Sequence, residues 1–235
     1  MPFNRATRGW VYRLAKNEGG ILGFGSTYDI HEAGALIFVN APFPVLDEER
    51  EPTPPLIIGD GACRHPFTGR SLINISGMSF GAISKPAVRA LSRGAAAAGC
   101  WMDTGEGGLS PYHLEGGGDI GTAKYGVRDA SGALSPEKLR EVAAHENVRA
   151  FEIKLSQGAK PGKGGVLPAG KVTEEIARIR GIPMGQDSLS PNRHRDIANM
   201  TQLLDMVERV RDITGKPVGI KTAIGGWHFM NDLAE

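Results

Sequence analysis

The segment 151-FEIKLSQGAKPGKGG-165 places a short apolar run directly before a glycine-rich loop. The run at 151–155 has the length of a buried strand, and the glycines and proline after it are typical of a loop. This order predicts a buried strand that opens onto a loop with a functional role. Three further runs precede glycine-containing loops in the same way, at 72-LINIS-76, 99-GCWMD-103 and 217-PVGIK-221.

Helical patterns separate these runs. The expected helices are one capped by Ser84 and running to Ala98, one opened by 135-SPE-137, one marked by Val172, Ile176 and Ile179, and one marked by Leu203, Leu204, Val207 and Val210. Gly215 and Pro217 end the last of them. Strands that alternate with helices are typical of a parallel sheet, and polar loops after the strands are typical of the C-terminal face of a barrel. We therefore predict an α/β fold, specifically a (β/α)₈ TIM barrel.

The first 60 residues have a different pattern. A strand-like run at 36–39 precedes the proline-rich 52-PTPP-55, which predicts a lead-in or cap segment over residues 1–60, with a boundary between 52 and 61. The barrel would then occupy residues 61–235. A complete barrel takes ~250 residues, whereas only 175 (235 − 60) follow the lead-in. Four or five βα units can be counted, so we expect the N-terminal part of a longer protein.

Composition restricts the classes of function. The chain is 40% hydrophobic and 23% charged, and 33 of its 235 residues are glycine, which predicts a folded rather than a disordered chain. The sequence shows neither an apolar run of the ~18 residues that a membrane helix needs nor a signal peptide. A net charge of +1 without basic blocks argues against nucleic acid as a partner. Together with few cysteines, these features predict a cytoplasmic protein.

Two familiar kinds of site are not supported by their context. The run 116-GGGDIG-121 matches the dinucleotide pattern G-x-G-x-x-G, but no convincing strand precedes it and no clear helix follows it. The six histidines lack metal-ligand spacing, and Cys63 and Cys100 lie too far apart in the sequence to form a ligand cluster. We therefore expect no Rossmann site and no metal ion.

Four charged residues stand out by their position. Glu106 lies between glycines, where backbone can approach a ligand closely, and Lys160 lies in the loop after the strand at 151–155. Lys154 and Lys221 each end a strand-like run. Local sequence leaves two interpretations open for each: a solvated charge, or a group that faces a ligand above the barrel.

Taken together, the segments resemble the flavin-binding synthase domain of glutamate synthases, and more closely the stand-alone FMN-binding glutamate synthase family. The resemblance covers nearly the whole chain and is carried by 76-SGMSFGAIS-84, 104-TGEGG-108, 152-EIKLSQGAKPGKGG-165, 167-LPAGKV-172 and 186-QDSLSPNRHRDI-197. It implies an FMN-dependent oxidoreductase with a (β/α)₈ barrel. In this family, reduced FMN delivers hydride to 2-iminoglutarate, formed from 2-oxoglutarate and ammonia, and L-glutamate results.

The resemblance also implies roles for individual residues. Glu106 and Lys160 match catalytic residues: the glutamate would transfer a proton or hold the imine nitrogen, and the lysine would contact the oxo-acid. Gln157 and Arg180 would bind the substrate, the arginine by clamping a carboxylate. The residues expected to contact FMN are Met78, Ser79, Thr104, Lys154 and Lys221.

The chain departs from the family pattern at three places. Val166 stands where glutamate synthases have a glutamine that helps bind 2-oxoglutarate, and 118-GDIGTAKYG-126 is about four residues shorter than its counterpart. The clustered cysteines of the family's iron–sulfur centre are absent from this chain. Ammonia and electrons would therefore come from an ammonia-supplying partner and an electron-donor protein. Two alternatives stay open: a flavin barrel acting on another imine, amine or oxo-acid, and an inactive flavin- or protein-binding fragment.

Overall fold

The computed structural model describes residues 4–18, 39, 41–155, 164–223, 226, 228 and 231. The chain divides into two units, Met1–Pro52 and Thr53–Glu235. The first contains helix α1 (Arg5–Ala15), whose N-cap Asn4 accepts a hydrogen bond from the backbone of Thr7, and a 3-10 helix, η1 (Asp47–Glu49). The strand expected at 36–39 lies outside the described residues except for Val39. No helix in the described ranges is long and apolar enough to cross a membrane.

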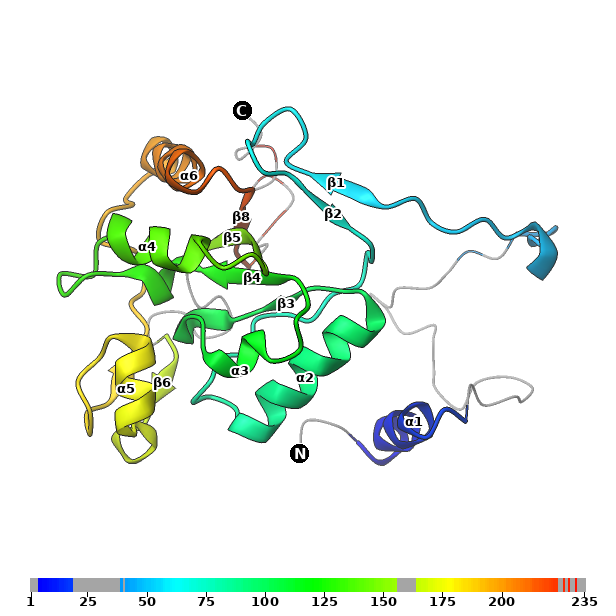
Figure 1. Cartoon of the computed structure of the whole chain (residues 1–235), viewed down its shortest axis with the longest axis horizontal. Coiled ribbons are helices and arrows are strands. Elements are labelled where there is room, and N and C mark those ends of the chain that lie inside the picture. Colours follow the sequence, from blue (N-terminus) through cyan, green and yellow to red (C-terminus); the bar gives the residue numbers. More distant parts are fainter. Residues whose placement is uncertain are drawn as a thin grey trace. The chain divides into compact units, whose positions relative to one another are not determined.

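The second unit is a mixed α/β structure (Figure 1). Its strands are β1 (Leu56–Ile58), β2 (Phe67–Gly69), β3 (Met102–Asp103), β4 (Ile120–Ala123), β5 (Val148–Lys154), β6 (Val166–Leu167), β7 (Ser188–Leu189) and β8 (Val218–Lys221). Its helices are α2 (Lys85–Ala98), α3 (Pro111–Leu114), α4 (Pro136–Ala143), α5 (Glu174–Arg180) and α6 (Met200–Thr214). Short 3-10 turns lie at Gly105–Gly107 (η2), Lys124–Val127 (η3) and Ala169–Lys171 (η4).

The main sheet is parallel and follows chain order. Its strands are arranged β3-β4-β5-β8, and a parallel bridge from Ile75 to Met102 extends the sheet on the β3 side. Because all these strands run the same way, their carboxyl ends lie at one edge of the sheet. Two antiparallel hairpins, β1-β2 and β6-β7, accompany it. The predicted α/β class with a parallel sheet is therefore confirmed.

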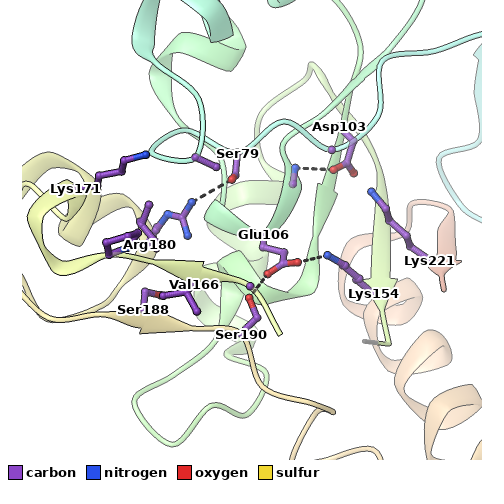
Figure 2. A pocket seen from close by; sticks show the side chains of 16 residues that line it. Ser79, Asp103, Glu106, Lys154, Val166, Lys171, Arg180, Ser188, Ser190 and Lys221 are labelled. Atoms are coloured by element: carbon purple, nitrogen blue, oxygen red, sulfur yellow. Dashed lines mark hydrogen bonds and ion pairs between the residues drawn. The ribbon is translucent and has the colours of Figure 1, made fainter. Parts of the chain in front are cut away.

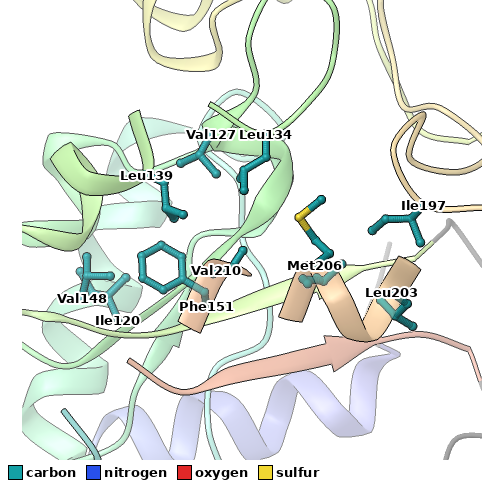
Figure 3. Packing of buried hydrophobic residues seen from close by; sticks show 11 residues of the cluster. Ile120, Val127, Leu134, Leu139, Val148, Phe151, Ile197, Leu203, Met206 and Val210 are labelled. Carbon is teal, nitrogen blue, oxygen red and sulfur yellow. The ribbon is translucent and has the colours of Figure 1, made fainter. Parts of the chain in front are cut away.

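Alternation along the strands separates an apolar face from a polar one. Phe151 and Ile153 of β5 are buried with residues of α4 and α6 in one hydrophobic cluster (Figure 3). A second cluster joins Met102 of β3 to residues of α2 and α5. Since successive side chains point to opposite faces of a strand, the charged residues between and after these apolar ones lie on the face away from the helices. That set comprises Asp103, Glu152, Lys154 and Lys221.

The four predicted helices form, with adjusted ends. Ser84 is the N-cap residue of α2, although its side chain makes no capping hydrogen bond. The side chains of Ser135 and Thr173 do cap α4 and α5. In α6, Leu203 and Val210 are buried, but Leu204 is 46% exposed and Met206 takes the inward position instead.

Two predicted strands are shorter than expected. Leu72 and Ile73 are exposed, and only Ile75 in that run makes a strand contact. Likewise β3 covers only Met102 and Asp103. The sequence pattern missed β4, because the glycine run before it masks its start, and it missed the β6-β7 hairpin, whose strands have two residues each.

Candidate active site

A pocket of about 350 Å³ lies at the carboxyl ends of the parallel strands (Figure 2). The loops after Ile75, β3 and β5 contribute to it, together with the β6-β7 hairpin and the end of α5. Its polar and charged lining side chains are Ser79, Asp103, Glu106, Lys154, Lys171, Arg180, Ser188, Ser190 and Lys221. The pocket therefore stands where parallel α/β sheets bind ligands.

Two lysines lie side by side at the end of the sheet. Lys154 of β5 and Lys221 of β8 are paired in register, so both ammonium groups project from the same polar face. Like charges directly opposite on neighbouring strands are unfavourable unless anions compensate them. Lys154 forms an ion pair with Glu106, whereas Lys221 reaches Ser76 Oγ only at 3.4 Å. The two lysines together favour an anionic or electron-rich ligand.

Both carboxylate oxygens of Glu106 accept hydrogen bonds. Oε1 accepts from Lys154 Nζ, and Oε2 accepts from Ser190 Oγ at 2.6 Å. Burial acts to raise the pKa of Glu106, but these two hydrogen bonds and the charges of Lys154 and Arg180 outweigh it, so the pKa lies below its usual range. Glu106 is therefore a fixed anion at neutral pH.

The surroundings of Asp103 shift its pKa in the opposite direction. Asp103 is 3% exposed; its Oδ1 accepts a 2.6 Å hydrogen bond from the backbone N–H of Gly105, and no donor among the described residues reaches its buried Oδ2, while the carboxyl of Glu152 lies within hydrogen-bonding reach of the Asp103 side chain. Burial, reinforced by repulsion from Glu152, raises the pKa of Asp103 to about 7. This carboxyl thus changes charge near neutral pH.

Arg180 closes the other side of the pocket. Its Nη2 donates to Ser79 Oγ and to the carbonyl of Phe80, both at 3.1 Å. The residue is thereby tied to the loop after Ile75, with Glu106 near enough to favour its charge. A guanidinium in this position suits a ligand carboxylate.

The loop at 76–79 approaches η2 closely, and glycines permit it. A Cβ on Gly77 would lie 2.7 Å from Asp103 Oδ1 and 3.0 Å from Lys221 Nζ, and Gly105 has a positive φ of 64°. The buried His113 supports the same loop: its Nε2 donates to the carbonyl of Met78 at 2.9 Å, while its Nδ1 accepts from the backbone N–H of Ser110. Burial lowers the pKa of His113, which keeps the ring neutral.

The structure brings five of the nine predicted site residues to the pocket: Ser79, Glu106, Lys154, Arg180 and Lys221. Met78 and Thr104 do not line it. The Met78 side chain packs against the second hydrophobic cluster, and the fully buried Thr104 hydroxyl bonds with that of Thr122. Gln157 and Lys160 lie outside the described residues.

Sequence reasoning missed four of the polar and charged lining residues: Asp103, Lys171, Ser188 and Ser190. Asp103 ends the strand-like run 99–103, and a carboxylate at the carboxyl end of a buried strand is itself an indication of a ligand site. Ser190 belongs to the stretch 186–197 that carries the family resemblance. Across the described part of the chain, no three His, Cys, Asp or Glu side chains gather as metal ligands do.

Residues 40–230 match the family described as "Conserved region in glutamate synthase". The chain belongs to this glutamate synthase family. It is 36% identical to the glutamate synthase large subunit-like protein YerD of Bacillus subtilis, over 99% of this chain and 52% of YerD. It is 33% identical to a glutamate synthase large subunit-like protein of Rhizobium meliloti, over 88% of this chain and 48% of that protein.

Over a shorter stretch, the chain is also similar to proteins named archaeal or archaeal-type glutamate synthase [NADPH]. An archaeal-type glutamate synthase [NADPH] of Thermotoga maritima is 39% identical over 64% of this chain and 28% of its own length. The chain spans about half the length of the two large subunit-like relatives it matches. The expected family membership is thus confirmed.

Proposed function

We propose that this chain forms the FMN and substrate site of an oxidoreductase that reduces 2-iminoglutarate, made from 2-oxoglutarate and ammonia, to L-glutamate. The observation that carries the proposal is the Glu106–Lys154 ion pair, set beside Lys221 at the carboxyl ends of the parallel strands. Membership of the glutamate synthase family gives this group of charges a chemical context.

Sheet topology favours the barrel interpretation within this proposal. Strands in chain order, each parallel to the one before, are what a (β/α)₈ barrel requires, whereas a doubly wound sheet reverses its strand order at a switch point. The polar inner face agrees with a ligand above the barrel core. We infer that residues 61–235 form the N-terminal part of a (β/α)₈ barrel, preceded by the lead-in segment at 1–60.

The residues present fit the ring system of FMN. Gly77 and Gly105 allow the loop at 76–79 and the turn η2 to pack closely against each other at the edge of the pocket, and Lys154 and Lys221 supply positive charge in the pocket. Cations near the pyrimidine edge of a flavin stabilise its reduced, anionic form. Ser79, Lys154 and Lys221 would hold the ring, and Met78 and Thr104 would support the loops behind it. When bound, FMN supplies the hydride for imine reduction.

The chain's own groups would orient the substrate. Arg180 would pair with a carboxylate of the oxo-acid, with Gln157 and Lys160 as further contacts, and Glu106 would accept hydrogen bonds from the imine or ammonia nitrogen. Fixing the substrate in this way lowers the entropic part of the barrier. Electrons and ammonia would come from partner proteins, and we expect the reaction to take place in the cytoplasm.

A second candidate substrate follows from Val166. This residue is 53% exposed and lines the pocket on strand β6, where it cannot offer the hydrogen bonds of an amide. An imine or oxo-acid with a more apolar side chain than 2-oxoglutarate would suit that wall. The flavin chemistry would be the same.

The first experiment identifies the cofactor. Purified protein is denatured, and the released flavin is separated by chromatography. FMN in a near one-to-one ratio with the chain is expected, and recovery of FAD or a nicotinamide cofactor would overturn the proposal. Gly77→Ala should lower the flavin content because its Cβ would meet Asp103 Oδ1 and Lys221 Nζ. Gly170→Ala is the matched control, since a Cβ there meets nothing within 4 Å.

A further inference from the structure

We propose that Asp103 holds the exchangeable proton of this pocket, while Glu106 stays ionised as its fixed anion. The assignment rests on the proposed function, because reduction of an imine adds a hydride to carbon and a proton to nitrogen. The proton must come from a group that can carry one at neutral pH. Among the described residues, Asp103 and Glu106 are the carboxyl groups that line the pocket, and their surroundings differ.

Glu106 is surrounded by donors. The ammonium of Lys154 bonds one oxygen and the hydroxyl of Ser190 bonds the other, at 2.6 Å. A proton added to either oxygen would displace one of these donors and leave the ammonium without its counter-charge. Hydrogen bonds to a charged group are each worth ~1.5–3 kcal/mol. Glu106 is therefore suited to holding a cationic or N–H-bearing ligand group rather than to releasing a proton.

Asp103 lacks such compensation. One of its oxygens accepts from the backbone N–H of Gly105, and no donor in the described part of the chain reaches the other, which is buried. The carboxyl of Glu152 lies within hydrogen-bonding reach, and such a contact between two carboxyls requires a proton on one of them. The carboxyl of Glu152 lies on the same polar face and repels the ionised form. A buried oxygen with no donor is costly when charged and much less so when it carries a proton.

The charged groups around Asp103 lie on strands β5 and β8 and on the turn η2. Glu152 on β5 favours the protonated form, and Lys221 on β8 opposes it. Strand β4 presents Gly121 opposite Asp103 and so adds no charge. Glu106 follows three residues later on η2, where Lys154 neutralises it. The balance leaves the pKa of Asp103 at about 7, while that of Glu106 is lowered. The pKa values of the two carboxyls are shifted in opposite directions, so Asp103 can act as the acid while Glu106 remains ionised.

The test is a pH titration of the ligand-free protein from pH 5 to pH 9, in which ¹³C NMR monitors the side-chain carboxyl groups. One side-chain carboxyl should titrate near neutral pH, disappear in Asp103→Asn and persist in Glu106→Gln. A neutral titration that persists in Asp103→Asn and disappears in Glu106→Gln would overturn the assignment, as would no carboxyl titrating in this range.

A second variant keeps the test decisive if Asp103→Asn does not fold. Glu152→Gln retains Asp103 and removes the repulsion, so the titration midpoint should move to lower pH. An unchanged midpoint would contradict the assignment. Because these measurements need neither flavin nor turnover, their outcome is independent of the proposed function. A protein that titrates as expected but reduces no imine would refute the function alone.

Discussion

Ser190 Oγ donates a 2.6 Å hydrogen bond to Glu106 Oε2, although 84 residues separate the two in the chain. The contact joins the β6-β7 hairpin to the turn after β3. Lys154 donates to the other oxygen, Oε1, so each carboxylate oxygen of Glu106 accepts a hydrogen bond from a different element. The ion pair at the centre of the pocket is thus completed by a hairpin that lies outside the main sheet.

Ser190→Ala should raise the pKa of Glu106. The Ser190 hydroxyl stabilises the ionised carboxylate, and a hydrogen bond to a charged group is worth ~1.5–3 kcal/mol, so its loss favours the protonated form. Carboxyl ¹³C titration measures the change directly. Ser188→Ala is the control, since Ser188 lines the same pocket on the same hairpin and no hydrogen bond joins its side chain to Glu106. Equal titration of Glu106 in both variants would show that Ser190 does not hold it.

Gly164→Ala should destabilise the protein. Gly164 has a φ of +64°, and a Cβ there would lie 2.2 Å from the carbonyl oxygen of Ser190. A side chain in an incompatible conformation costs more than ~1 kcal/mol, which lowers the melting temperature by at least about 2 °C in a chain of this size. Thermal unfolding followed by circular dichroism measures this. Gly170→Ala, where the Cβ enters open space, should melt like the wild type; equal losses in both variants would argue against the close approach.

Asp103→Asn should change how stability depends on pH. The pKa of Asp103 rises from 3.8 to about 7 on folding, so the folded state keeps a proton that the unfolded chain has released. This carboxyl therefore costs increasing stability as pH rises from about 4 to about 7. The variant should gain stability relative to the wild type between pH 5 and pH 8 in urea unfolding. Curves for Asp103→Asn and the wild type that stay parallel across this pH range would contradict the raised pKa.

Local sequence patterns predicted the strands and helix ends that depend on neighbouring residues in the chain. The run 151–155 and the cap at Ser135 specify β5 and the start of α4 within a few residues. Glu106 was recognisable because glycines flank it. The sequence pattern could not place Ser190 beside Glu106. Nor could it show that Asp103 is buried beside Glu152 with no donor to its Oδ2, because both features depend on contacts between distant segments. Strands of two residues, such as β6 and β7, carry no periodicity at all.

Val166→Gln should strengthen the use of 2-oxoglutarate. The side chain lines the pocket, and an added hydrogen bond to a charged ligand is worth ~1.5–3 kcal/mol, or about a 10- to 150-fold gain in apparent affinity. The measurement is the rate of reoxidation of the reduced protein over a 2-oxoglutarate titration with ammonium present. Leu189→Gln, on the paired strand, controls for added polarity on the hairpin. An unchanged or weaker affinity in Val166→Gln would remove the case for an apolar substrate.

The most direct test of the central claim is a single-turnover reaction. Flavin-loaded protein is reduced with dithionite under anaerobic conditions and mixed with 2-oxoglutarate and ammonium, while flavin absorbance and L-glutamate are followed together. The account predicts reoxidation with one L-glutamate per flavin, slowed ~10²–10³-fold in Glu106→Gln, the cost typical of losing one positioned electrostatic group at the reacting atoms. Flavin that stays reduced with every 2-oxo acid offered, or that reoxidises without forming an amino acid, would contradict it.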